Sequence, residues 1–229
     1  MKIFLLLFSF LGLVQAQDNA FKLTLASHSY SVSGWAQDLN LRHSSDFGTA
    51  WLGYYHSRGQ DTQQARAGWE RSFGDTIRLQ PSLQVAAGGF VGGSLNLETG
   101  DTWVFGVGLG RTNLRPYVNL NVDPNDSWQL MASYRPESGQ VFTLSYIRDN
   151  RENPEQQHLH FIVKLPLANK DKLSVDLLYK RGLVEQQRIS KLGATLTYDW
   201  SQYSLRAAYE PNPNFTVENV WRLSAALRF

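Results

Sequence analysis

The sequence predicts an all-β protein that folds as a single closed, antiparallel, up-and-down β-barrel and crosses a membrane with about fourteen strands. Segments of about ten residues alternate between apolar and polar side chains, which indicates strands with one apolar face. All seven Trp residues lie within or beside these segments, as aromatic residues do at the two interfaces of a membrane barrel. The apolar run near the amino-terminus, residues 3–14, is well short of the roughly 20 residues that a transmembrane helix needs, and no later run reaches even that length.

The amino-terminal segment predicts export. Residues 1 and 2, Met-Lys, precede an apolar run over residues 3–14, and residues 14–16, Val-Gln-Ala, form a small-residue cleavage pattern. We expect residues 1–16 to be a signal peptide that is removed. Residues 17–229 then form one barrel domain, with no linker that would divide it.

Charge and cysteine content exclude several classes of function. The chain has 22 basic and 20 acidic residues and no long basic block, so it offers no electrostatic footprint for nucleic acid. It has no Cys, which excludes disulfides, thiolate metal sites and cysteine nucleophiles. We predict no cofactor.

The alternating segments give the expected strand boundaries. Closed barrels of this kind have an even number of strands, with short turns at one end and longer loops at the other. Fourteen strands are expected near residues 20–30, 35–43, 47–56, 63–73, 76–87, 102–111, 114–122, 127–135, 140–148, 157–166, 172–181, 186–198, 201–210 and 218–229. A barrel of twelve longer strands is the alternative.

One glycine-rich segment competes with this count. Counting residues 88–100 as a strand gives fifteen and breaks the even parity. Because Gly is depleted in strand interiors, we assign residues 88–100 to an outer loop. Pro81 indicates a bulge or break in its strand, since proline cannot donate to the ladder. Parity then predicts periplasmic turns near 74–75, 112–113, 136–139 and 199–200, and outer loops at 149–156 and 211–217.

The polar faces of the strands predict the residues that line the barrel interior. A soluble β-sandwich exposes its polar face to bulk water, whereas a barrel lumen holds charges of both signs that must pair. The predicted lumen residues are Arg66, Glu70, Arg78, Arg115, Lys164, Asp176, Lys180, Arg206, Glu210 and Arg222. If the lumen is open, their excess of cations favours small anionic solutes.

The last strand carries a recognisable signature. Trp221, Leu223, Ala225, Leu227 and Phe229 share one face. Together with the signal peptide and the alternating strands, this ending resembles the integral outer-membrane β-barrels of Gram-negative bacteria. The resemblance implies an outer-membrane location, contact with outer-membrane lipids, and recognition of Trp221, Leu223, Leu227 and Phe229 by the barrel assembly machinery. It specifies a class and not an activity, and we expect a narrow passive pore or a structural membrane protein.

The catalytic candidate is the pair His43 and Ser45. On one strand face, His-x-Ser sets an imidazole beside a hydroxyl, as acyl transfer requires. The pair resembles that of outer-membrane phospholipases and lipid A deacylases, which implies a lipid-modifying acyl hydrolase as the alternative function. The Asn or Glu that orients the histidine in those families is replaced by Ser57, with His56 and Gln60 beside it. Ser and Asp at an expected turn bond to nearby backbone, so we favour turn chemistry for this segment.

His158 and His160 share a face at a spacing compatible with metal binding. Their strand contains no acidic residue and the chain has no Cys, so nothing local completes a set of metal ligands. We predict no metal site and expect lumen histidines beside Lys164.

Overall fold

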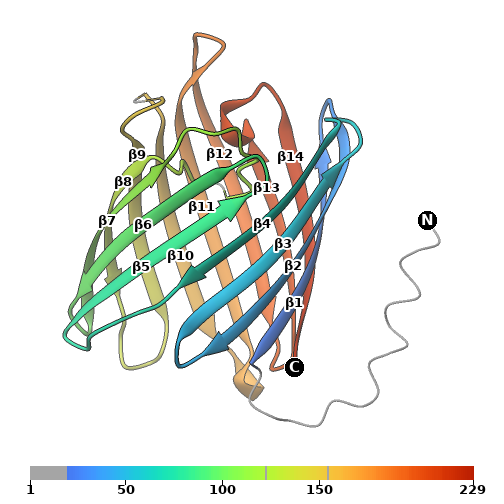
Figure 1. Cartoon of the computed structure of the whole chain (residues 1–229). Coiled ribbons are helices and arrows are strands. Elements are labelled where there is room, and N and C mark those ends of the chain that lie inside the picture. Colours follow the sequence, from blue (N-terminus) through green and yellow to red (C-terminus); the bar gives the residue numbers. More distant parts are fainter. Residues whose placement is uncertain (1–19, 122, 154) are drawn as a thin grey trace.

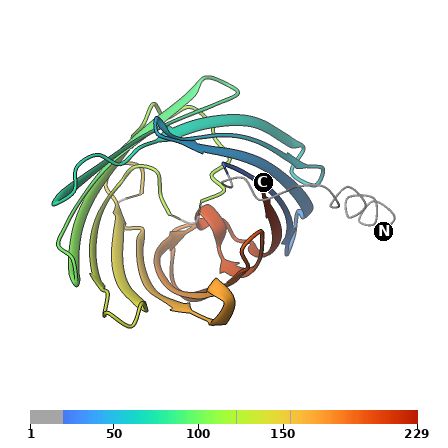
Figure 2. The same ribbon diagram turned by 90° about the horizontal axis from the view of Figure 1, so that it is seen from below.

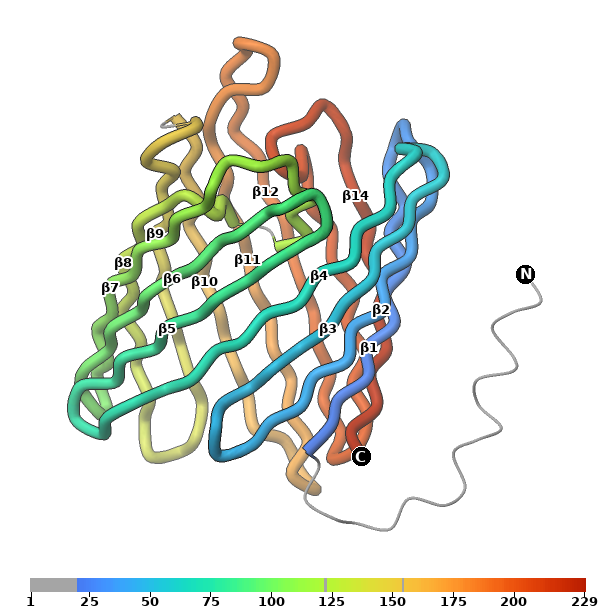
Figure 3. Tube along the Cα trace, viewed as in Figure 1, coloured from blue at the N-terminus to red at the C-terminus, as the bar shows by residue number. Residues whose placement is uncertain are grey.

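The chain forms a closed barrel of fourteen antiparallel strands in a computed structural model that describes residues 20–121, 123–153 and 155–229. Each strand pairs with its neighbour in sequence, and β14 pairs with β1 to close the sheet, as Figures 1 and 3 show. This confirms the expected fold. Closure means that every strand in the described part of the chain has a neighbour on both sides. The expected signal peptide, residues 1–16, lies outside the described residues.

The strands are eight to thirteen residues long. In chain order they are β1 (Phe21–Tyr30), β2 (Gly34–Ser45), β3 (Gly48–Ser57), β4 (Thr62–Glu70), β5 (Ile77–Ala86), β6 (Phe90–Thr99), β7 (Trp103–Thr112), β8 (Ser127–Tyr134), β9 (Val141–Asp149), β10 (Gln157–Pro166), β11 (Lys172–Val184), β12 (Gln187–Asp199), β13 (Tyr203–Pro211) and β14 (Asn219–Arg228). Two short 3-10 helices, η1 (Ala168–Lys170) and η2 (Pro213–Phe215), lie in connections.

The two ends of the barrel differ. The start of β1 and the carboxy-terminus lie at the lower end in Figure 1, which we call the terminal end. The longest connections, residues 113–126, 150–156 and 212–218, lie at the opposite end, which we call the loop end.

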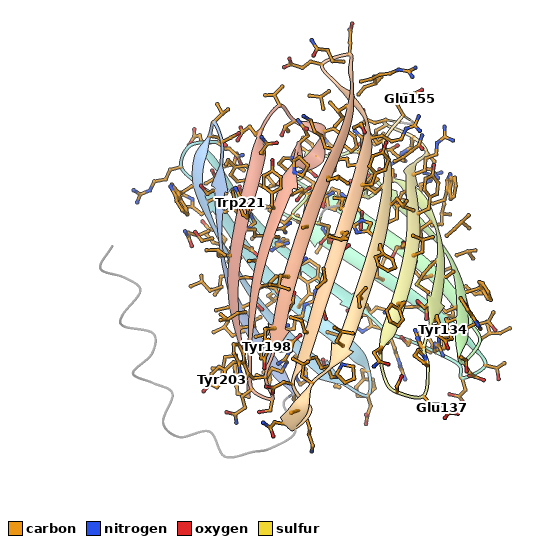
Figure 4. The ribbon with its side chains drawn as sticks, turned by 180° about the vertical axis from the view of Figure 1, so that it is seen from behind. Tyr134, Glu137, Glu155, Tyr198, Tyr203 and Trp221 are labelled. Carbon is orange, nitrogen blue, oxygen red and sulfur yellow. The ribbon has the colours of Figure 1, made fainter. Side chains whose placement is uncertain are left out.

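The outer surface is apolar between two sets of aromatic side chains. Leu52, Leu192 and Leu223 are each more than 60% exposed on this surface. Figure 4 shows Tyr134 near the terminal end and Trp221 near the loop end. So much contiguous apolar surface, bounded by aromatic residues, is suited to a lipid bilayer. Within the described residues, no helix is long and apolar enough to cross a membrane.

The last strand lies where the alternation places it. Trp221, Leu223 and Leu227 occupy outward positions of β14. The Phe229 ring stacks on Phe21, and the two residues exchange backbone hydrogen bonds of 2.9 and 3.0 Å.

Two expected assignments near the middle of the chain are wrong, and they compensate in the strand count. Residues 90–99 form β6 and not an outer loop. Residues 114–121, expected to be a strand, form none, because Leu114 has a φ of 60° and leaves the extended conformation. The connection after Thr112 therefore lies at the loop end, and not at the end expected to be periplasmic.

Pro81 does not interrupt its own strand. β5 continues through it, with Pro81 opposite Leu95 of β6. On the other side, the β4–β5 ladder ends at the pair of Glu70 and Ser82. The missing N–H of proline thus falls where pairing with β4 stops.

Candidate functional site: a lumen crossed by an inner segment

Residues 113–121 and 123–126, here called the inner segment, fold into the barrel at the loop end. The Gln64 side chain of β4 accepts a 2.8 Å hydrogen bond from the Val118 N–H and donates one of 3.1 Å to the Val118 carbonyl. Gln64 is buried, and its side-chain amide provides hydrogen-bond partners for the backbone N–H and carbonyl of Val118, as a neighbouring strand would.

Further contacts hold the inner segment to other parts of the barrel. The Tyr117 ring stacks on Phe90 of β6 at 4.1 Å between centroids. Arg222 of β14 donates to the Leu120 carbonyl at 2.8 Å. Asn214 of η2 donates to the Asn119 carbonyl, also at 2.8 Å. Because these anchors come from separate strands, the inner segment crosses the lumen, as the view along the barrel in Figure 2 shows.

Asp126 fixes the segment where it returns to the wall. Its buried carboxylate accepts hydrogen bonds from the Thr112 N–H at 3.0 Å and the Thr112 hydroxyl at 2.6 Å. Arg151 forms an ion pair with the same carboxylate at 2.5 Å. The two ends of the segment are therefore tied together.

Two of the cavities in the lumen lie beside the inner segment. The larger, of about 440 Å³, is lined by Gln84, Asn96, Gln129 and Arg206 among others. The smaller, of about 250 Å³, lies between β2, β3, β4 and β5. Asn121 of the segment lines both cavities. The segment thus narrows the lumen between them.

A buried charge network lies on the wall formed by β11, β13 and β14. The ammonium of Lys180, a fully buried residue, lies 3.2 Å from Glu210 Oε1 and donates to the carbonyls of Pro211 and Asn212. Arg222 pairs with the second oxygen of Glu210 at 3.1 Å. The Glu210 carboxylate therefore offsets two cations in a desolvated place.

Other lumen charges differ in whether they are paired. Arg66 contacts Asp38 at 2.6 Å, and Arg78 contacts Glu98 at 3.2 Å. Arg206 lines the larger cavity and makes no ion pair or hydrogen bond within the described residues. Its charge is thus available to a solute.

The structure places nine of the ten predicted lumen residues on inward positions of strands. These are Arg66, Glu70, Arg78, Lys164, Asp176, Lys180, Arg206, Glu210 and Arg222. Arg115 instead belongs to the inner segment, which corrects its expected place in a strand. The nine residues do not form one site. Ion pairs connect Glu210 with Lys180 and Arg222. Arg78 and Lys164 lie towards the terminal end.

The lumen histidines acquire acidic partners that sequence reasoning missed. Asp123 Oδ1 lies 2.8 Å from His158 Nδ1 and 3.0 Å from His160 Nε2, and Asp176 Oδ1 lies 2.9 Å from His160 Nδ1. Burial alone would raise the pKa of the Asp123 carboxyl, but the two histidines hold it well below its usual range. The contact of His160 with Asp176 could have been predicted from the pairing of β10 with β11, because the two residues lie diagonally opposite each other. The contact with Asp123 could not be predicted in this way, because residues 114–122 were expected to form a strand and Asp123 to lie in the connection after it.

His43 and Ser45 do not assemble a catalytic group. The His43 ring stacks on Phe21 at 4.5 Å, and the Ser45 hydroxyl donates to the Gly48 carbonyl across the β2–β3 turn. Ser57 and Gln60 lie at the opposite end of β3. Among the described residues, no hydrogen bond joins His43 to Ser45 or to a third group.

No family model and no curated protein matches this chain. Among solved structures, the outer-membrane protein Omp33 of Acinetobacter baumannii matches with a TM-score of 0.58 and 9% identity, over 92% of this chain and 98% of that one. The chain has the fold of an outer-membrane β-barrel. The NanC porin and OprD of Pseudomonas aeruginosa also match, with TM-scores of 0.49 and 0.44, identities of 10% and 11%, and coverage of 90% and 92% of this chain and 100% and 93% of theirs.

Proposed function

We propose that the protein is an outer-membrane channel through which small anionic solutes diffuse passively, and that the inner segment sets its width. The observation that carries this proposal is the unpaired Arg206 facing the 440 Å³ cavity beside that segment. The outer-membrane barrel fold shared with Omp33 and the apolar outer surface support it.

The number of strands favours an open path for solutes over an interior filled by side chains. Side chains fill a barrel of about eight strands, whereas fourteen enclose more space. Along β5, β6 and β7, several of the residues that line the larger cavity are small, such as Ser82, Ser94 and Gly108. The lumen beside them has room for water and solutes.

The charge balance of the lumen favours anions. The carboxylates of Asp38, Glu98 and Glu210 are each neutralised by an Arg or Lys. Lys164 and Arg206 face inward and make no ion pair within the described part of the chain. Uncompensated cations on a channel wall attract anions and repel cations.

Reversal potentials in planar bilayers test this proposal. Under a KCl gradient, the protein should pass chloride in preference to potassium. Arg206→Gln should reduce that preference, because it removes a positive charge that lines the cavity and forms no ion pair within the described residues. Arg188→Gln is the matched control, since Arg188 is exposed near the β11–β12 hairpin and should leave the preference unchanged. A folded barrel that gives no conductance would instead favour a structural membrane protein, the second candidate. Nothing in the arrangement of His43 and Ser45 favours an acyl hydrolase.

A further inference from the structure

Three side chains beside the larger cavity converge on one point. Asp123 Oδ1 contacts both His158 Nδ1 and His160 Nε2, and the three atoms lie within 4.8 Å of one another. Asp123 belongs to the inner segment, whereas both histidines belong to β10. The cluster therefore joins the inner segment to the barrel wall.

His160 meets a carboxylate at each of its ring nitrogens. Its Nδ1 lies 2.9 Å from Asp176, and its Nε2 lies 3.0 Å from Asp123. A neutral imidazole carries a single N–H, so one of these contacts would set a lone pair against a carboxylate oxygen. The geometry calls for an additional positive charge, which is either a proton or a metal ion.

The two contacts to Asp123 are close to the spacing of metal ligands, whereas the two imidazole nitrogens, within 4.8 Å of each other, would have to lie at a similar spacing once an ion binds. With metal–ligand bonds of about 2.0–2.1 Å, neighbouring ligand atoms of a tetrahedral site lie roughly 3.3 Å apart. The two contacts to Asp123, at 2.8 and 3.0 Å, need to lengthen by only a few tenths of an ångström. An ion then takes the place of the protons between these atoms.

The surroundings prepare the two histidines as ligands. A hydrogen bond from Nδ1–H to Asp176 directs the lone pair of His160 Nε2 towards Asp123, which is the orienting role that a carboxylate takes behind a metal-bound histidine. His158 is fully buried, and its ring stacks on Phe215 with centroids 5.6 Å apart. The His158 Nε2 is buried and has no partner among the described residues, which leaves Nδ1, the nitrogen that faces Asp123, as the atom of this ring that can bind an ion.

We infer that Asp123, His158 and His160 bind a divalent transition-metal ion of the Zn²⁺ class. Two imidazole nitrogens and one carboxylate oxygen suit Zn²⁺, whereas Ca²⁺ and Mg²⁺ prefer all-oxygen sets. Asp123 and His160 line the 440 Å³ cavity, so water reaches the fourth coordination position. The ion fastens the inner segment to β10, whether or not the barrel conducts solutes.

Calorimetric titration of the refolded, tag-free full chain with Zn²⁺ tests the inference. We expect one ion per chain, and Co²⁺ should give the visible absorption of a four-coordinate site. Asp123→Asn should weaken Zn²⁺ binding by on the order of 100-fold, because it removes a charged ligand. Asp176→Asn should weaken it by about 10-fold while the Co²⁺ spectrum persists, because Asp176 positions His160 without touching the ion. His43→Gln, which changes an exposed histidine at the terminal end, should bind as the parent does.

Heat-modifiable gel mobility establishes that each variant is folded. If Asp123→Asn fails to fold, Asp176→Asn carries the test, since it keeps all three ligands. Absence of stoichiometric Zn²⁺ binding by the folded parent chain would overturn the inference. Equal binding by the parent and the folded Asp variants would overturn it as well.

Discussion

Two walls of the same lumen are built in opposite ways. The wall of β10, β11, β13 and β14 carries the charges and the histidines, many of them buried, as at Lys180, Glu210 and His158. Apart from Arg111, the wall of β5, β6, β7 and β8 presents small or neutral side chains to the larger cavity, as at Ser94 and Gly108. Here we call them the charged wall and the small wall.

The difference shows how one barrel can hold a segment in place and still leave space. The charged wall anchors the inner segment through Arg222 and the histidine cluster. The small wall allows the segment to pass close to it, since at Gly110 a Cβ atom would lie 2.3 Å from the Asn125 carbonyl oxygen. Stability should therefore depend on charge at the first wall and on side-chain volume at the second.

The largest expected difference in stability between the two walls comes from removing a carboxylate charge. Glu210→Gln strips the buried Lys180 and Arg222 of their shared carboxylate, which should lower the free energy of unfolding by about 3 kcal/mol. Glu98→Gln breaks the half-exposed pair with Arg78 on the small wall and should cost less than about 1 kcal/mol. Denaturant unfolding of both variants in lipid vesicles measures the difference. Similar losses would mean that the two walls do not differ as described.

The next effect concerns volume on the small wall. Gly110→Ala drives a methyl group against the Asn125 backbone and should cost about 1–3 kcal/mol in unfolding free energy. At Gly108, the nearest atoms to an added Cβ are the side-chain ends of Asn96 and Gln129, which can rotate away. Gly108→Ala should consequently cost less. The same denaturant measurement ranks the pair, and the reverse order would contradict the close passage of the segment at Gly110.

The smallest expected change in unfolding free energy tests whether every charge on the charged wall contributes to the stability of the barrel. Arg206 makes no ion pair or hydrogen bond within the described residues, so Arg206→Gln should change the free energy of unfolding by less than about 0.5 kcal/mol. Arg222→Gln removes contacts to Glu210 and to the Leu120 carbonyl and should cost more. A large loss for Arg206→Gln would show that its charge is structural.

The sequence was sufficient for the barrel because its strands repeat a local rule. Alternation continues through β6 despite its glycines, with Val91, Leu95 and Leu97 facing outward. The same pattern misled at Leu114, Val118 and Leu120, which alternate without forming a strand. Their conformation is decided by contacts with Gln64 and Arg222, which are distant in sequence and carry no local signal.

The site followed from the sequence only in part. Strand parity placed charged residues such as Arg206 and Glu210 on inward positions, because a side-chain period of two needs no tertiary information. Which of them pair depends on separations across the lumen, as between Lys180 and Glu210. The contact of Asp123 with β10 could not be predicted from the sequence, since it requires the inner segment to enter the barrel.

Single-channel recording of two proteins tests the central claim that the inner segment narrows an open lumen. Thr112 and Asp126 are hydrogen-bonded to each other, so a short Gly-Ser linker in place of residues 114–124 can close the β7–β8 connection. We expect discrete conductance steps from the full-length chain and larger steps from the shortened one. Equal steps from the two proteins, or no discrete steps from either, would contradict the account.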